Sequence, residues 1–269
     1  MSEGDDEAVT VPRSLVLTLH PDAVQVPAHQ AAALCKEVVN LYFAALSSAD
    51  LSQPPPEPQD TFFNLQISQT LSAEERRSQH ERWVLAKAFQ DLMRGVRGSL
   101  EKAYFFIELL SAGPFIAKSN STLDQALAPF RIKAQKMNFP DLMGHVNQRL
   151  ETPLVFAEAY SSMQAARNCF EHRDGIVGSQ DANADGLLKM YFPGLKFYVD
   201  QGGKEVEIYK NFRTEEETVL KIKMEVRERI FLVGERLTIS AADFNEIAFS
   251  CVQFGTALAL QLPKTRSVA

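Results

Sequence analysis

The residues whose types and spacing could do chemistry lie in one short stretch, Arg167-Asn168-Cys169-Phe170-Glu171-His172. An arginine binds phosphate oxygens through paired donors and stabilises negative charge that grows on them. A histidine accepts or donates a proton near neutral pH, and an asparagine can orient an imidazole or bind a sugar or phosphate oxygen. RNA carries its own nucleophile, the 2′-hydroxyl next to each phosphate. The stretch therefore suits metal-free phosphodiester cleavage in RNA.

The spacing of apolar residues predicts a helix over 154–172 that positions this stretch. An apolar stripe at helical spacing comprises Phe156, Ala159, Met163, Ala166 and Phe170. Asn168 and His172 are four residues apart, so they share a helix face outside that stripe. His172 falls in the last turn, where the helix dipole favours a protonated imidazole. We expect Arg167, Asn168 and His172 to be the catalytic residues.

Three further arginines are the candidates for substrate binding. Arg173 follows His172 directly, and Arg94 and Arg97 belong to a basic helical region farther upstream. That region could be one wall of an anion groove or a solvated helix face with paired acidic residues.

The same residues also permit a purely structural interpretation. Arg167 and Glu171 are four apart and could form a weak surface ion pair. Asn168 could hydrogen-bond His172, and His172 with Arg173 could serve only to complement the helix dipole. The chemistry of the residues alone favours this alternative.

A resemblance to a known family changes that balance. Arginine, a polar residue and then histidine after a four-residue gap resemble the signature of HEPN domains. Gly175-Ile176-Val177, which follows this motif, resembles HEPN members related to the RiboL-PSP and MAE_28990 groups. HEPN domains are helical, and many are metal-independent endoribonucleases of toxin–antitoxin, abortive-infection and CRISPR systems. Their active sites commonly form where two motif copies meet in a dimer. The resemblance implies that Arg167 binds phosphate, His172 is catalytic and Asn168 supports it.

The resemblance also implies partners: RNA, a second copy of the chain in a homodimer, and a cognate antitoxin or regulatory protein in a toxin or phage-defence system. It covers only residues 165–178, and the chain departs from a minimal HEPN unit by its length and by Glu171 beside His172. Some HEPN proteins lack nuclease activity. A non-catalytic HEPN-like module that binds a protein or nucleotide is therefore the alternative, and a helical protein with a chance motif is a third reading.

The pattern along the chain predicts a mainly α fold, a HEPN-like helical bundle with a small antiparallel β segment before a C-terminal helix. Ser72 begins a long helix with a capping box, and Trp83 is expected on the apolar stripe of that helix. Two alternating segments around Gly202-Gly203 predict a hairpin, and another hairpin could turn at Gly234. A run of prolines over 53–59 predicts an exposed loop. The expected organisation is a loose N-terminal segment (1–27), the bundle (28–180), the β segment (190–239) and a C-terminal helix packed on the bundle (240–262).

Composition narrows the class of protein. The 269 residues carry a formal net charge of −6, which argues against broad, non-specific nucleic-acid binding but leaves room for a small basic site. Three widely spaced cysteines predict reduced thiols and a cytoplasmic location. No stretch has the roughly 20 apolar residues of a membrane helix, so we expect no membrane partner.

The sequence supports neither a metal nor a cofactor. Asp181-Ala182-Asn183-Ala184-Asp185-Gly186 imitates the start of a calcium loop, but Phe192 stands where the bidentate glutamate would be, so an Asx-rich turn is expected. Zinc-protease, dinucleotide and Walker motifs are absent from the sequence.

Overall fold

A computed structural model describes residues 18–53, 71–112, 122–208, 212–213 and 217–264. The first 17 residues of the predicted loose segment and most of the predicted proline loop lie outside the described residues. In chain order the elements are η1 (Pro21–Val24), α1 (Val26–Ser48), α2 (Ala73–Ala112), α3 (Leu123–Lys136), α4 (Phe139–Asn147), α5 (Ala157–Arg173), β1 (Leu187–Gln201), β2 (Lys204–Glu207), β3 (Lys221–Leu232) and α6 (Ala241–Leu260).

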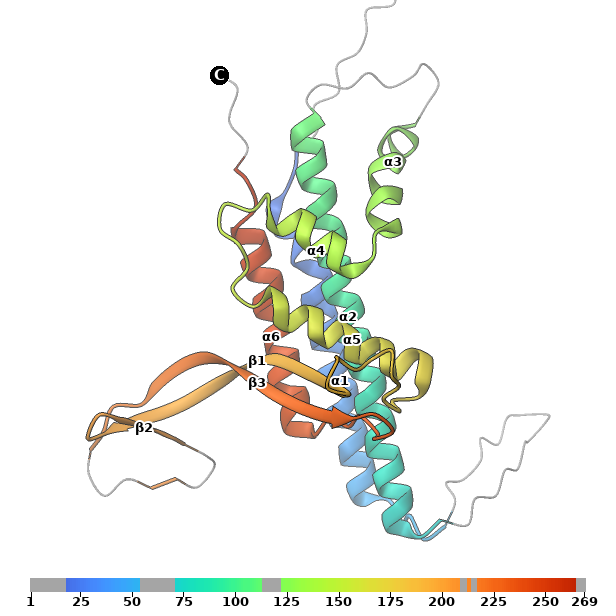
Figure 1. Cartoon of the computed structure of the whole chain (residues 1–269), viewed down its shortest axis with the longest axis vertical. Helices are drawn as coiled ribbons and strands as arrows, with labels where there is room; N and C mark the ends of the chain where they lie inside the picture. The colour runs from blue at the N-terminus through green and yellow to red at the C-terminus, as the bar shows by residue number, and fades with distance from the viewer. Residues whose placement is uncertain (1–17, 54–70, 113–121, 209–211, 214–216, 265–269) are drawn as a thin grey trace, which may run out of the picture.

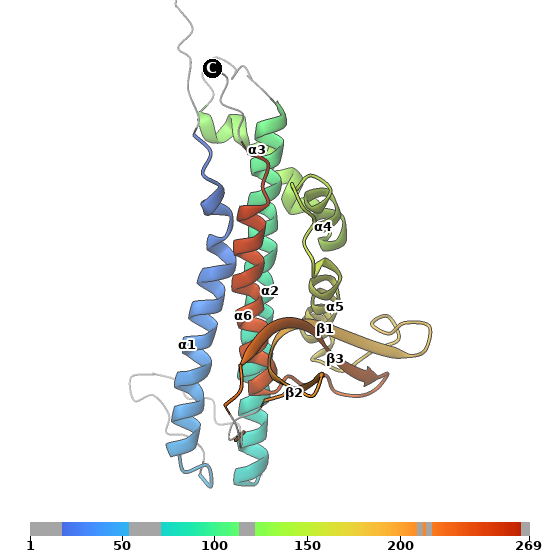
Figure 2. The ribbon, with the colours of Figure 1, turned by 90° about the vertical axis from the view of Figure 1, so that its left-hand side faces the viewer.

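The protein is mainly helical with a small three-stranded antiparallel sheet, as the sequence predicts at that level. Helices α1, α2 and α6 run side by side along the long axis of the molecule (Figure 1, Figure 2). Helices α4 and α5 pack against α2, and β1 packs against α5 and α6. Beyond that contact the sheet extends away from the helices (Figure 1).

Side-chain caps begin several of these helices, including the one that the sequence predicts at Ser72. The backbone N–H of Glu75 donates to Ser72 Oγ at 3.2 Å, and that of Ser72 donates to Glu75 Oε2 at 2.9 Å. Ser240 and Asp243 form the same reciprocal pair before α6. Such caps satisfy backbone donors that have no partner within the helix.

Helices α1 and α2 approach each other unusually closely at Gly95. A Cβ atom placed on Gly95 would lie 2.5 Å from the Cβ of Ala31 and 2.9 Å from the carbonyl oxygen of Pro27. A glycine is therefore required at this crossing.

The strand order is β2-β1-β3. Gly202 and Gly203, with φ of 62° and 82°, form the predicted hairpin turn between β1 and β2. Strand β3 pairs with β1 from Leu187↔Leu232 to Tyr198↔Lys221. The second hairpin is not formed: Gly234 lies in the turn after β3, where its N–H donates to the carbonyl of Val177 at 2.8 Å. The chain after β3 thus returns to the end of α5.

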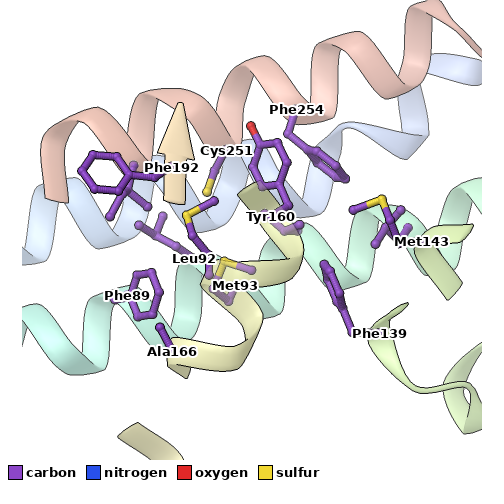
Figure 3. Close-up of a cluster of buried hydrophobic side chains, with 14 of the residues drawn as sticks. Phe89, Leu92, Met93, Phe139, Met143, Tyr160, Ala166, Phe192, Cys251 and Phe254 are labelled. Carbon is purple, nitrogen blue, oxygen red and sulfur yellow. The ribbon is translucent and has the colours of Figure 1, made fainter. Parts of the chain in front are cut away.

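The core explains how α5 is oriented. Side chains of α2, α4, α5, β1 and α6 meet in one buried cluster (Figure 3). Ala159, Met163 and Ala166 of α5 are buried, and the ring of Phe170 meets that of Phe89 edge-on at 5.8 Å. This stripe faces α2 and β1 packs against another side of α5, whereas Glu171 and His172 in the last turn are exposed.

Candidate functional site

The C-terminal end of α5 is held firmly in place. Asp174 has a left-handed conformation with φ of 50°, and the N–H of Gly175 donates to the carbonyl of Cys169 at 3.2 Å. Arg236 donates to the carbonyl oxygen of Asp174 at 2.6 Å. These contacts fix the turn that carries the predicted histidine, because they satisfy carbonyl groups that a helix end leaves without a partner.

His172 is exposed on the last turn of α5. Within the described part of the chain it has no hydrogen bond or ion pair to hold its imidazole. Asn168, one turn earlier, lies on the same side of the helix. The imidazole is therefore available to a molecule that docks at this helix end.

Arg167 is directed toward its own helix. Its guanidinium forms an ion pair with Glu171 and donates to Asn168 Oδ1 at 3.3 Å. The amide of Gln164 donates to the same Asn168 oxygen at 3.0 Å. The predicted ion pair between Arg167 and Glu171 is thus confirmed, whereas Asn168 engages Gln164 and Arg167 instead of His172.

The structure brings Arg94 to this cluster. Arg94 Nη2 lies 3.8 Å from Glu171 Oε1, and its guanidinium also forms an ion pair with Asp91 on α2. Two of the predicted arginines, Arg94 and Arg167, therefore meet at one carboxylate between α2 and α5.

The other two predicted arginines have different surroundings. Arg97 donates to Glu101 Oε1 at 2.9 Å and to the carbonyl oxygen of Met137 at 2.8 Å, so it anchors the end of α3 to α2. Arg173 binds both carboxylate oxygens of Asp181, whose Oδ2 also accepts from the N–H of Gly178 at 2.9 Å. Within the described residues, neither the Arg97 nor the Arg173 guanidinium forms an ion pair with Glu171.

A pocket beside α5 is lined by residues outside the predicted site. It has a volume of about 270 Å³ and is lined by Gln79, Arg82, Trp83, Ala86, Lys87, Gln90, Phe170, Asp174, Arg236, Leu237, Thr238 and Ile239. Trp83, expected on the apolar stripe, is 57% exposed instead. We call this cavity the Trp83 pocket. A tryptophan flanked by arginine and lysine is the signal that could have identified it.

The region that imitates a calcium loop forms an Asx turn, as expected. Asn183 Oδ1 accepts from the N–H groups of Asp185 at 3.0 Å and Leu187 at 3.1 Å. Across the described ranges, no group of three or more His, Cys, Asp or Glu side chains is arranged to hold a metal ion. In the same ranges, no helix has the length and apolarity to cross a membrane.

Comparisons with family models, curated proteins and solved structures give no match to this chain. The HEPN resemblance therefore depends on residues 165–178 alone.

Proposed function

We propose that the chain is a metal-independent endoribonuclease of the HEPN type. The observation that carries the proposal is the exposed imidazole of His172 on the last turn of α5, with the guanidiniums of Arg167 and Arg94 gathered on the flank of the same helix. A proton-transfer group and phosphate-binding cations are the parts that RNA self-cleavage requires.

In the proposed reaction a base removes the proton from a 2′-hydroxyl of the RNA. The 2′-oxygen forms a bond to the adjacent phosphorus, and the bond from phosphorus to the 5′-oxygen breaks. The departing 5′-oxygen takes up a proton, which leaves a cyclic phosphate and a free 5′-hydroxyl. His172 is the proton-transfer group, Arg167 and Arg94 stabilise the charge on the phosphate oxygens, and Asn168 positions Arg167.

The placement of Arg167 and His172 on α5 is the reason to propose a homodimer. They are five positions apart, so they point roughly 140° apart around the helix. One phosphate is reached more readily by the arginine of one copy and the histidine of another than by both from one copy. A toxin or phage-defence role, with an antitoxin or regulatory protein as partner, belongs to the same proposal.

Cleavage of single-stranded RNA in EDTA tests the proposal. We expect the wild type to cut and His172→Ala to abolish cutting while the thermal midpoint stays unchanged, because His172 is exposed. His20→Ala, at another exposed histidine, is the matched control and should cut normally. A substrate with 2′-deoxy sugars should resist cleavage, because it lacks the 2′-hydroxyl nucleophile. Equal cutting by wild type and His172→Ala would refute the catalytic role.

A second candidate is a non-catalytic module that binds a protein or nucleotide. It is favoured by the pairing of Arg167 with Glu171 and of Arg173 with Asp181, because paired guanidiniums have less charge to offer a phosphate. This candidate predicts no RNA cleavage by the wild type.

A further inference from the structure

The Trp83 pocket lies between the N-terminal half of α2, the C-terminal end of α5 and residues 236–239. We infer that it binds one unpaired base of a single-stranded RNA, with Trp83 as the stacking surface. This inference rests on the proposed nuclease function and adds the place where the substrate is held.

Trp83 is suited to stacking by its exposure. It is the only tryptophan in the chain, and 57% of it is exposed, whereas Phe89, Tyr104 and Phe106 on the same helix are buried. An indole face available at a pocket wall can stack with any base, because every base has a π-face. The pocket would therefore accept RNA with little sequence preference.

The charges around the pocket favour an anionic ligand. Three cations, Arg82, Lys87 and Arg236, line it, against one carboxylate, Asp174. Arg82 donates to Ser78 Oγ at 2.8 Å and Lys87 to Gln90 Oε1 at 3.5 Å, so these two cations have neutral partners. Their charge is available to the phosphate next to a bound base.

Gln90 adds a polar group inside the pocket. It is 4% exposed, and its carbonyl oxygen is the atom that Lys87 approaches. Within the described residues its amide nitrogen donates to no acceptor and is not fully buried, so it can donate a hydrogen bond to a ligand. An acceptor on a base edge fits this donor.

The pocket lies at the same end of α5 as the proposed catalytic residues, although none of these residues lines it. Trp83, Lys87, Gln90 and Arg94 follow one another at helical spacing, so they share one face of α2. Arg94 reaches Glu171 on α5, and Phe170 and Asp174, which both line the pocket, lie on either side of His172 in the chain. A strand with a base on Trp83 and its backbone along Lys87 and Arg94 is directed toward the last turn of α5.

The indole itself reports on the proposed contact. In full-length protein carrying His172→Ala, which keeps the RNA intact, a single-stranded oligoribonucleotide should quench Trp83 fluorescence. A blunt duplex of the same sequence should not, because its bases are already stacked within the helix. By anisotropy of labelled RNA at fixed salt, Trp83→Ala should weaken binding about tenfold, and Trp83→Phe should weaken it less.

Phe197→Ala is the matched control, because Phe197 is an aromatic residue 40% exposed on β1, away from the pocket. It should bind RNA like the parent protein. Unquenched fluorescence, with RNA bound and cut equally well by Trp83→Ala, would overturn the pocket inference and leave the nuclease function standing. Quenching without cleavage by wild type would keep the pocket and refute the nuclease. If the protein neither binds nor cuts RNA, the pocket inference and the nuclease proposal are both refuted.

Discussion

The carboxylate of Glu171 forms an ion pair with the guanidinium of Arg167 one turn earlier on α5, and its other oxygen lies 3.8 Å from Arg94 Nη2. One negative charge thus holds two cations from two helices. Since carboxylate and phosphate oxygens bind guanidinium in the same way, Glu171 occupies a position that an RNA phosphate would compete for.

Glu171→Gln should strengthen RNA binding. The amide keeps the size of the side chain but removes its charge, so Arg167 and Arg94 become freer to bind phosphate. We expect a gain of about two- to fivefold in affinity at low salt, in the His172→Ala background, by anisotropy of labelled RNA.

The change in overall charge needs its own control. Glu37→Gln, at an exposed position on α1, alters net charge equally and should leave affinity almost unchanged. If both variants bind RNA as the parent does, the two guanidiniums do not meet the phosphate.

Gly95→Ala should destabilise the protein although alanine favours helix. The added methyl group would meet Ala31 at 2.5 Å and the carbonyl oxygen of Pro27 at 2.9 Å, so α1 must shift away from α2. Overpacking costs about 1–3 kcal/mol, and a contact this close to backbone belongs to the upper part of that range, above the roughly 1 kcal/mol that helix propensity supplies. Urea unfolding followed by circular dichroism measures the difference.

The matched variant for this test is Gly144→Ala, inside α4. No atom lies within 4 Å of a Cβ placed there, so only the gain in helix propensity remains. It should stabilise the protein by about 0.5–1 kcal/mol. If Gly95→Ala and Gly144→Ala change the free energy of unfolding in the same direction, the close approach at Gly95 is contradicted.

The three cysteines should resist alkylation in the folded protein. Cys35, Cys169 and Cys251 are buried and form no disulfide. Burial raises the pKa of Cys35 to about 11 and that of Cys251 to about 12, and it also raises the pKa of Cys169. Since the thiolate is the reactive form, iodoacetamide at pH 8 should modify these residues only after denaturation. Rapid labelling of native protein, read by mass spectrometry, would show that the core opens.

The sequence predicted local structure well because local structure depends on near neighbours. Capping residues such as Ser72 and Ser240 set helix starts, and Gly202-Gly203 set a turn. The pairing of β3 with β1 was not predictable, because register depends on contacts between segments far apart in the chain.

The predicted site shows the same division. Helical spacing correctly placed Arg167 beside Glu171 and His172 outside the apolar stripe. It could not show that Arg97 is directed to the end of α3, because that depends on how α3 packs against α2. Periodicity places Trp83 on the apolar stripe of its helix, but the side chain is exposed. Apolar spacing does not show which part of a helix surface the neighbouring elements cover.

Glu108 should make stability depend on acid pH. It accepts from His145 Nε2 at 3.0 Å and lies 3.6 Å from both Lys133 Nζ and Arg149 Nη1, so it joins α2 to α3 and α4. Burial, the largest single influence, acts to raise the pKa of Glu108. The hydrogen bond from His145 and the nearby cations together outweigh it, so the pKa falls below its ordinary value of 4.5.

A carboxyl group whose pKa is lower in the folded state stabilises that state above its ordinary pKa, and this contribution is lost as pH falls through the folded value. Glu108→Gln should therefore lower the free energy of unfolding at pH 7 by about 1–3 kcal/mol. The gap from wild type should shrink below about pH 4.5, where wild-type Glu108 begins to take up its proton. Urea midpoints at pH 7 and pH 3 measure both effects, with Glu37→Gln as control. A gap that stays constant between the two pH values would mean that the charge of Glu108 does not hold these helices together.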